Sequence, residues 1–531
     1  MSNYIPTIGL EVHAELKTRT KMFCSSKNDP DEVRPNVNVC PVCMGFPGTL
    51  PVPNREALRQ VLRVGSAVGG TLADYTEFDR KNYFYPDLPK GYQISQYEYP
   101  LVKGGMIAGV QLTRIHLEED TARLAHDANL AADPRRLNAD SRRIEHAQEV
   151  EYSLVDFNRS GIPLMELVTE PVIHDAKTAS FFAQELQRLL RALSAGEANM
   201  EKGQMRVEAN ISIAPATDIF ASAEERRQNA EGRRKDILAN ELILRNSASS
   251  LRVSAISTLG TKVEIKNINS FKAVEKAIAY ELERQEELLE RGEKVIQETR
   301  GWDENRGITF SQRLKEGSAD YRYFPEPDIP EFHLSRIDEF SPESLMKTLP
   351  ELPWQKRSRY LSLGLKETET EILVADPLYA EFFDAEILGH LKPEEIQIGS
   401  NYLLSDIRGL GATEGELKNL RGGKFAEIIR LIGKSAVSSR GAKELIAVIL
   451  KEGGEPYEQA TKNGLLQMQD MGAISGIADD VISENAKVSD EVRKGKAEAL
   501  KFLIGQGMKK SKGTANPAEL ERILREKLKP V

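Results

Sequence analysis

Apolar and polar residues alternate from Ile8 to Leu16, near the start of the chain. This period of two is typical of a strand with one buried face, so Glu11, His13 and Glu15 are expected to project from the same face. Burying two carboxylates and an imidazole is costly unless a charge neutralises them, and a divalent cation such as Mg²⁺ suits these ligands. A solvated polar face over an apolar back is the other interpretation of this segment.

The same patterns divide the rest of the chain into a mixed part and a helical part, so the predicted fold class is α+β. Strands are predicted at 5–16, 107–116, 152–157, 206–213 and 261–267, and helices at 55–68, 176–193 and 271–291. Helical patterns dominate after a proline-rich connector at 325–353. The predicted domains are 1–292 with a polar insertion at 214–258, then 293–405, then 406–531.

Length and composition indicate a globular protein of several domains. The chain has 531 residues, of which 29% are charged and 40% hydrophobic, and this length predicts two to four domains. No run of about twenty apolar residues is present, so no membrane span is expected. Three cysteines cannot form a fully paired disulfide framework, and the first strand leaves no room for a targeting segment, so a reducing cytoplasm is expected.

Net charge and its distribution bear on nucleic-acid binding. A net charge of −9 argues against a chain that coats nucleic acid over its whole surface. The segment from Arg493 to Lys512 nevertheless holds seven cations and one carboxylate. This segment is either a solvated helix surface or a phosphate-binding patch.

Four further segments contain side chains suited to chemistry. The segment 79–92 combines cations and aromatic rings, which could bind phosphate and stack on a base, or simply pack under a rigid loop. At 115–120 a strand ends in Glu118, Glu119 and Asp120, and because successive strand residues point to opposite faces, Glu119 should point away from the other two. Segments 153–166 and 264–270 each lead from a strand into a polar turn, and Asn269 or Ser270 is expected to cap the following helix, whose N-terminus could bind an anion.

The cysteine spacing is compatible with a zinc site, which is one of two interpretations. Cys40 and Cys43 form a Cys-Pro-Val-Cys motif that is typical of one half of a zinc knuckle. A closed structural zinc site needs four ligands. The other half of such a site normally supplies two cysteines, but here Cys24 is followed by Ser26, so it supplies one thiol. His13 or water could complete the site; free thiols are the other alternative.

Taken together, these sequence segments resemble the B subunit of the aspartyl/glutamyl-tRNA(Asn/Gln) amidotransferase, the GatB/GatE family. The resemblance extends over nearly the whole chain. Its matching segments lie at 9–13, 79–92, 116–120, 153–167, 264–271, 320–328 and 507–517.

The resemblance implies a fold and an activity. The implied fold is a glutamine-synthetase-like cradle, followed by an all-α domain and a YqeY-like helical tail that binds tRNA. The implied enzyme is a carbon–nitrogen ligase with glutamine as amide donor, a heterotrimer in which the partners of this chain are the amidase, or A, subunit and the small C subunit. With ATP and Mg²⁺ it phosphorylates the side-chain carboxylate of Glu on tRNA(Gln) or Asp on tRNA(Asn), and ammonia channelled from the amidase displaces the phosphate.

The resemblance also implies roles for particular residues. The acidic metal cluster maps to Glu11, His13, Glu118, Glu119 and Glu264, of which Glu11, His13, Glu119 and Glu264 are expected to bind Mg²⁺. Whether Glu118 or Glu119 is the ligand stays open at this point. The nucleotide and tRNA-end pocket maps to Arg80, Lys81, Asn82, Tyr83, Tyr85, Asn158, Lys266 and Asn269. Cys24, Cys40 and Cys43 correspond to a zinc site, and Lys501, Lys509, Lys510 and Lys512 are expected to contact tRNA.

The chain departs from the family pattern at three places. Ser26 stands where a second cysteine is usual, which puts zinc in doubt. Glu208 stands where Asp is usual, so it receives no ligand role. The insertion at 214–258 is longer than the usual connection, but it is too small for the extra domain of the related archaeal E subunit.

Two other functions compete with this enzyme. One is a tRNA-binding scaffold without catalytic activity, against which the set Glu11, His13 and Glu264 argues. The other is a free-standing amino-acid ligase of the glutamine synthetase kind, for which the basic segment 493–512 would have no use. The sequence does not distinguish Glu-tRNA from Asp-tRNA as substrate.

Overall fold

The computed structural model describes residues 3–125, 154–216, 260–314, 321–468, 470–511 and 513–529. The chain forms two compact units, Met1–Pro353 and Trp354–Val531. Most of the predicted insertion at 214–258 lies outside the described residues. Among the helices that the structure describes, none is both long and apolar enough to cross a bilayer.

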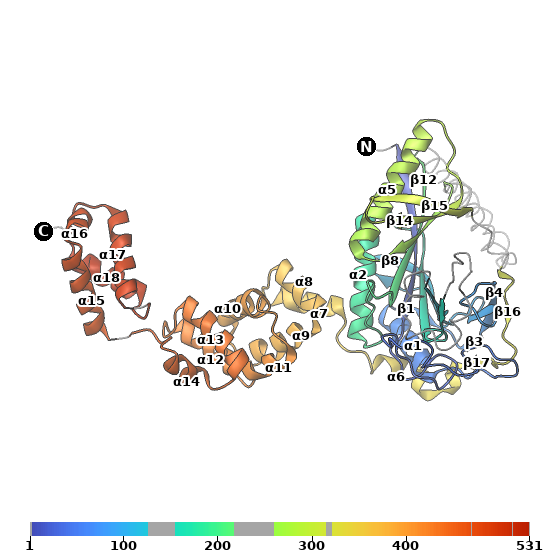
Figure 1. Ribbon diagram of the computed structural model, residues 1–531, viewed down its shortest axis with the longest axis horizontal. Helices are drawn as coiled ribbons and strands as arrows, with labels where there is room; N and C mark the ends of the chain where they lie inside the picture. Colours follow the sequence, from blue (N-terminus) through green and yellow to red (C-terminus); the bar gives the residue numbers. More distant parts are fainter. Residues whose placement is uncertain are drawn as a thin grey trace, which may run out of the picture. The chain divides into compact units, whose positions relative to one another are not determined.

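A ten-stranded sheet forms the centre of the first unit (Figure 1). Its strands follow the order β15-β14-β13-β12-β1-β11-β8-β6-β2, and β7 pairs with β8 beside this path. Only the β13–β14 pair is parallel within this described sheet. The strands are β1 (Tyr4–Glu15), β2 (Thr71–Leu72), β6 (Val102–Lys103), β7 (Met106–Ile107), β8 (Val110–Glu119), β11 (Pro163–Thr169), β12 (Met205–Pro215), β13 (Val263–Ile268), β14 (Glu298–Asp303) and β15 (Ile308–Leu314).

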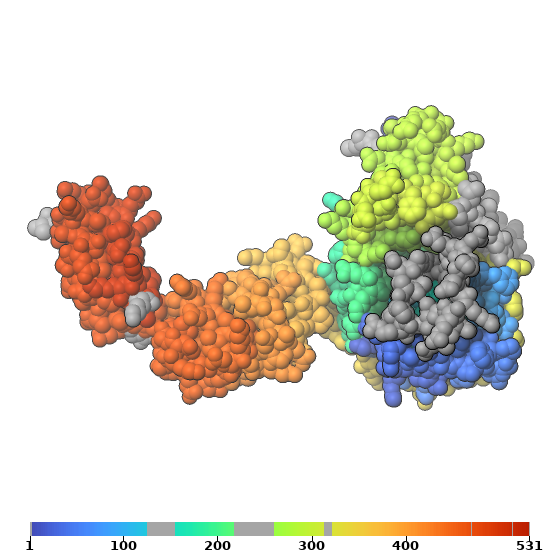
Figure 2. Space-filling model, viewed as in Figure 1, coloured from blue at the N-terminus to red at the C-terminus, as the bar shows by residue number. Residues whose placement is uncertain are grey.

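Three helices pack on the apolar face of this sheet: α1 (Arg55–Ala67), α2 (Ala176–Ala192) and α5 (Phe271–Glu290). The side chains of Asn54, Asp175 and Ser270 each accept backbone N–H bonds as N-caps, which fixes where these helices begin. α2 and α5 run side by side, and the β14–β15 hairpin joins α5 in one continuous surface (Figures 1 and 2).

Short strands and helices surround the main sheet. A three-stranded sheet has the order β16-β4-β5, and the pairs β9–β10 and β3–β17 are separate. These elements are β3 (Tyr75–Thr76), β4 (Asp79–Asn82), β5 (Tyr92–Ser95), β9 (Arg123–Ala125), β10 (Leu154–Asp156), β16 (Phe324–Pro325), β17 (Phe332–His333), η4 (Leu334–Arg336), η5 (Asp338–Phe340) and α6 (Pro342–Met346).

The second unit is helical and has two hydrophobic cores. The first core draws on residues between Tyr360 and Ala460, and the second on residues between Ile474 and Leu528. The helices are α7 (Pro353–Ser362), α8 (Glu367–Ala375), α9 (Pro377–Phe382), η6 (Phe383–Leu388), α10 (Pro393–Asn401), η7 (Tyr402–Ile407), α11 (Glu414–Leu417), η8 (Lys418–Leu420), α12 (Lys424–Gly433), α13 (Ser439–Glu452), α14 (Pro456–Lys462), α15 (Met471–Glu484), α16 (Ala486–Arg493), α17 (Ala497–Lys510) and α18 (Pro517–Lys527).

The α+β class is confirmed, but the compact units differ from the predicted boundaries. The sheet continues past residue 292, because β14 and β15 extend it beyond β13. Residue 405 lies inside η7, and Leu404 and Ile407 belong to the first helical core. A boundary at 405 would therefore cut through packed side chains, whereas Leu466 packs against the first helical core and Met468 against the second.

Candidate active site

The alternation in β1 separates an apolar face of the sheet from a polar one. Leu10, Val12 and Ala14 are fully buried on the side of the helices. Glu11 and His13 project from the opposite face, as the period of two predicted. Neighbouring strands in register with β1 add further polar side chains to this face, and these form two groups.

The first group, the His13 group, consists of His13, Glu118 and Glu166. Nε2 of His13 lies 3.3 Å from a carboxylate oxygen of Glu166 and 3.6 Å from one of Glu118. Register explains the contact, because His13 on β1 pairs with Glu166 on β11, which pairs in turn with His116 on β8. Nε2 of His116 lies 3.3 Å from Glu166 on its other side. Three strands that are distant in the sequence thus bring two imidazoles and two carboxylates together.

Neighbouring charges and hydrogen bonds outweigh burial in setting the pKa values of His13 and Glu166. Burial by itself would lower the pKa of His13, but the hydrogen bond and charge of Glu166, with the charges of Glu118 and Glu208, raise it to about 9. Burial would raise the pKa of Glu166, but the charges and hydrogen bonds of His116 and His13 hold it well below its usual range. Without a cation, His13 is therefore an imidazolium at neutral pH.

The second group, the Glu11 group, consists of Glu11, Glu208 and Glu264, with carboxylate oxygens within 4.8 Å of one another. Glu11 faces Glu208 across the β1–β12 pair, and Glu264 lies on the next strand, β13. Nζ of Lys266 is 2.8 Å from Glu208 and 3.9 Å from Glu264. Nδ2 of Asn210 donates to Glu11 at 2.7 Å.

Lys81 extends from the small β4–β5–β16 sheet toward the His13 group. Its Nζ lies 3.9 Å from a carboxylate oxygen of Glu118 and 5.5 Å from the ring centroid of Tyr321. Burial would lower the pKa of Lys81, but Glu118, Tyr323 and Glu166 raise it well above its usual value. Lys81 and Lys266 thus place one ammonium beside each group of acids.

The structure places two of the acids differently from what the sequence suggested. Glu119 was expected to bind Mg²⁺ with Glu11, His13 and Glu264, but its side chain points away from them. It pairs with Lys90 and accepts the backbone N–H of Ile94 at 3.0 Å. The reason is the strand alternation itself, which gives the position facing His13 to Glu118. Glu208, to which no ligand role was given, belongs to the Glu11 group, because its longer side chain still reaches Glu11 and Glu264.

Several residues predicted to line the nucleotide pocket form structural contacts instead. Arg80 makes a bidentate pair with Glu326, at 2.7 and 2.8 Å, and stacks over the ring of Tyr92. Nδ2 of Asn82 donates to the carbonyl of Arg322 at 2.7 Å. These contacts hold β16 against β4, and they direct Arg80 and Asn82 away from the two groups of acids.

Of the remaining pocket residues, Tyr83 packs edge-on against Tyr321, next to Lys81, whereas Tyr85, Asn158 and Asn269 lie elsewhere. The Tyr83 hydroxyl is 3.3 Å from Gln93 Oε1, and Tyr85 is exposed. Asn158 accepts the N–H groups of residues 37 and 38 and donates to the carbonyl of residue 34, so it fixes the cysteine loop. Asn269 is exposed, and Ser270 rather than Asn269 is the N-cap of α5.

The three cysteines come together, with Sγ atoms within 4.8 Å of one another. Nζ of Lys21 lies 3.6 Å from Cys43 Sγ, and Ser26 Oγ lies 3.9 Å from the same sulfur. The hydrogen bond from Cys24 lowers the pKa of Cys43 most; burial opposes it, the charge of Lys21 adds to it, and the result is about 4. This cysteine cluster offers three thiols and a hydroxyl, one thiol fewer than a closed Cys₄ zinc site.

The lysines expected to contact tRNA lie at the end of the second unit. Lys501 and Lys509 are exposed on α17. Nζ of Lys510 lies 2.8 Å from Asp480 and 2.6 Å from Glu484, so this cation is already paired. Lys512 lies outside the described residues.

Sequence reasoning missed Glu166 and His116 as members of the site. Glu166 stands among the buried apolar residues of β11, and a carboxylate there needs a partner. That signal was present in the sequence, but residues 153–166 were interpreted as a strand that leads into a turn. His116 was noticed only as part of an acidic strand end.

The two groups fit hard divalent cations. Carboxylate oxygens are the ligands that Mg²⁺ prefers, and an imidazole can complete the His13 group once it has lost its second proton. The Glu11 group brings three carboxylates together beside the ammonium of Lys266. Both groups lie on rigid strands, so their ligands are positioned before any cation binds.

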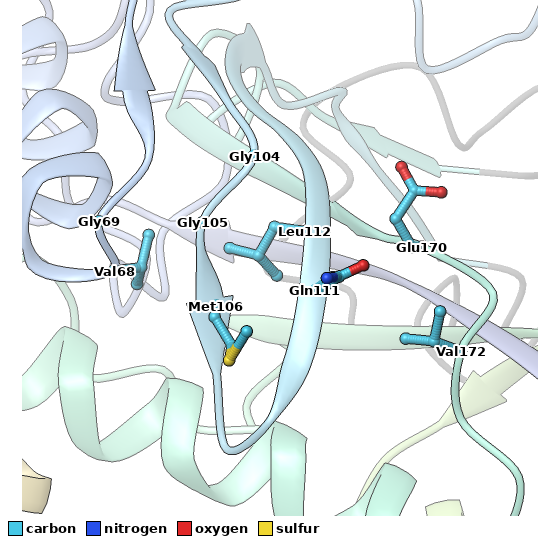
Figure 3. Close-up of a pocket in the computed structure, with 9 residues that line it drawn as sticks. All are labelled: Val68, Gly69, Gly104, Gly105, Met106, Gln111, Leu112, Glu170 and Val172. Carbon is cyan, nitrogen blue, oxygen red and sulfur yellow. The ribbon is translucent and has the colours of Figure 1, made fainter. Parts of the chain in front are cut away.

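A cavity of about 560 Å³ lies elsewhere, at the edge of the sheet near β6, β7 and β8. Met106, Gln111 and Glu170 are among the side chains around it (Figure 3). None of the residues that line it belongs to either group of acids. The cavity therefore does not mark the candidate active site.

Comparison with known proteins agrees with this architecture. A family model described as the GatB/GatE catalytic domain matches residues 6–231 and 244–338, and one described as the GatB domain matches residues 379–528. The B subunit of the aspartyl/glutamyl-tRNA(Asn/Gln) amidotransferase of Picosynechococcus sp. is 40% identical over 552 residues, covering 99% of this chain and 98% of the relative. The Thermus thermophilus protein of the same name is 40% identical over 533 residues, covering 99% of both chains. The chain therefore belongs to the family of aspartyl/glutamyl-tRNA(Asn/Gln) amidotransferase B subunits.

Proposed function

We propose that this chain is the kinase and transamidase subunit of a tRNA-dependent amidotransferase. It uses ATP to phosphorylate the side-chain carboxylate of Glu on tRNA(Gln), of Asp on tRNA(Asn), or of both. Ammonia then attacks the acyl phosphate, a C–N bond forms, and phosphate leaves. The observation that carries this proposal is the pair of acid groups on one face of β1, in a chain that belongs to an amidotransferase family.

The reaction needs activation because a carboxylate is a poor electrophile. Transfer of the γ-phosphoryl group makes a leaving group, and most of the catalysis then comes from positioning and neutralising charge. Same-face residues on a strand are about 7 Å apart, so Glu11 and His13 can serve separate cation sites that flank one substrate.

Each group has a defined part in this proposal. Glu11, Glu208 and Glu264 would hold one Mg²⁺, and His13, Glu118 and Glu166 another; Mg²⁺ supplies charge neutralisation for phosphate oxygens. Lys81 and Lys266 stand beside the groups and can donate to oxygens of ATP or of the acyl phosphate. His116 holds Glu166 in place from the side opposite His13.

The partners that we propose are those that the family resemblance implies. The ammonia would come from glutamine, which the amidase, or A, subunit would hydrolyse, and the small C subunit would complete the heterotrimer. The exposed Lys501 and Lys509 on α17 would contact phosphates of the tRNA. Zinc has no part in the proposed reaction.

Amide formation by the reconstituted heterotrimer tests this proposal. Glu-tRNA(Gln) and Asp-tRNA(Asn) are supplied with ATP, Mg²⁺ and glutamine. The wild-type chain and Glu283→Gln, an exposed change on α5, should form product. Glu11→Gln should abolish the product while glutamine hydrolysis continues. A wild-type heterotrimer that binds tRNA but forms no amide on either substrate would favour the inactive scaffold.

A further inference from the structure

The cysteine cluster differs from the zinc site that the family resemblance implies. Among the described residues it contains the thiols of Cys24, Cys40 and Cys43, and Ser26 is the fourth polar side chain next to them. Structural zinc sites are almost always closed by four nitrogen or sulfur ligands. A serine hydroxyl is not among those ligands, so the donor set does not fit a closed tetrahedral zinc centre.

Protein groups already satisfy the sulfur at the centre of the cluster. Cys43 Sγ lies 3.6 Å from Nζ of Lys21 and 3.2 Å from the backbone N–H of Cys40. The side chain of Lys21 is fully buried, and its Nζ also donates to the carbonyl of Phe157 at 3.1 Å. A buried ammonium needs partners of this kind, and here it finds a sulfur and a carbonyl.

The same cluster is tied to the turn that precedes β11. Ser160 Oγ donates to the carbonyl of Cys43 at 2.8 Å, and the N–H of Met22 donates to the carbonyl of Gly161 at 2.7 Å. Gly161 has a φ of 82°, and a Cβ at this position would lie 3.3 Å from the Cβ of Cys43. The loop and the turn are therefore held in close contact by hydrogen bonds that need no metal.

We infer that the cysteine cluster is a structural element that needs no metal. In it, the ammonium of Lys21 takes the role that a metal ion would otherwise have. The position of the cluster supports the turn at 157–161 and, through it, the start of β11. Ser26 is the residue that makes the cluster differ from a four-thiol zinc site. Replacing it with cysteine supplies the fourth thiol, and zinc binding should then stabilise the fold.

Metal analysis of the full-length purified chain tests this inference. The wild-type chain, produced with zinc present and then dialysed against a chelator, should retain well below one zinc per chain, and its Tm should not change on chelation. Ser26→Cys should retain about one zinc per chain and lose several degrees of Tm when the zinc is removed. A wild-type chain that keeps one zinc through the chelator, or whose Tm falls on chelation, would overturn the inference. So would a Ser26→Cys chain that gains no zinc affinity.

A second pair of variants tests the role of Lys21. Lys21→Met should lower Tm by several degrees, and added zinc should not restore it. Lys27→Met removes an exposed lysine from the same loop, paired at the surface with Asp29, and should leave Tm nearly unchanged. Equal Tm for the two variants would contradict the role of Lys21. If Lys21→Met does not fold, the metal content of the wild-type and Ser26→Cys chains decides the question.

Discussion

Glu11 and His13 project from the same face of β1, two residues apart, yet they belong to different groups of acids. His13 contacts Glu118 and Glu166, and Glu11 joins Glu208 and Glu264. A single strand thus contributes one ligand to each of two candidate cation sites.

Glu208 should be as important as Glu11, although the family resemblance implies a shorter acid, Asp, at this position. Glu208→Gln removes one of three carboxylates from the Glu11 group and leaves Lys266 without its nearest partner. We expect amide formation to fall by about 100-fold or more, as for loss of a metal ligand or its support. Glu208→Asp, which restores the usual acid, should keep most of the activity. If Glu208→Gln were as active as Glu283→Gln, Glu208 would have no place in the site.

Substitution of Glu118 should affect metal binding, and substitution of Glu119 should affect the stability of the fold. Glu118→Gln should weaken Mn²⁺ binding, measured by calorimetry as a probe of the Mg²⁺ site, by about tenfold or more. Glu119→Gln should leave Mn²⁺ binding nearly unchanged but destabilise the fold by about 2 kcal/mol, because the half-buried Lys90 would lose its charged hydrogen-bond partner. The reverse pattern would show that Glu119 is the ligand.

The raised pKa of His13 makes the stability of the metal-free chain depend on pH. Its folded-state pKa is about 9, against an ordinary value of 6.5. The stabilisation is therefore complete below pH 6.5 and is lost as the pH rises through 9, with a total of at most about 3 kcal/mol. Denaturant unfolding of the metal-free chain at pH 6 and pH 9.5 should show this loss. The His13→Asn variant should lack it, and an equal loss in that variant would assign the dependence to other groups.

Lys501 and Lys509 should contribute to tRNA affinity more than Lys510 does. Each exposed lysine that contacts a phosphate should add about 1 to the slope of log affinity against log salt. Lys510 is paired with Asp480 and Glu484, so Lys510→Gln should change the slope less than Lys501→Gln or Lys509→Gln. Filter binding at several salt concentrations measures these slopes. Equal slopes for all three variants and the wild type would remove α17 from the tRNA contact.

Local patterns in the sequence were sufficient for the polar face of β1 and for the main helices. The alternation from Ile8 to Leu16 correctly placed Glu11 and His13 on one face, and the same rule separated Glu118 from Glu119. Helices α1, α2 and α5 begin at the predicted residues 55, 176 and 271, and Ser270, one of the two predicted caps, is the N-cap of α5. These features depend only on neighbours along the chain.

Features that depend on strand register could not be predicted. His13 meets Glu166 because β1 pairs with β11, more than 150 residues away, and no local pattern encodes that pairing. The ion pair between Arg80 and Glu326 also depends on strand pairing, because β16 joins β4 from a distant part of the chain. The continuation of the sheet past residue 292 could not be predicted either, because β13 is followed by a helix and the sheet resumes only with β14.

The most direct test of the central claim is ATP cleavage that depends on mischarged tRNA, measured in the reconstituted heterotrimer with glutamine and ammonia withheld. Without the amide donor, ADP release reports the phosphorylation step alone. We expect cleavage by the wild-type chain and Glu283→Gln, and none by Glu11→Gln or His13→Asn. Equal cleavage by all four chains would contradict the assignment of this chemistry to the polar face of β1.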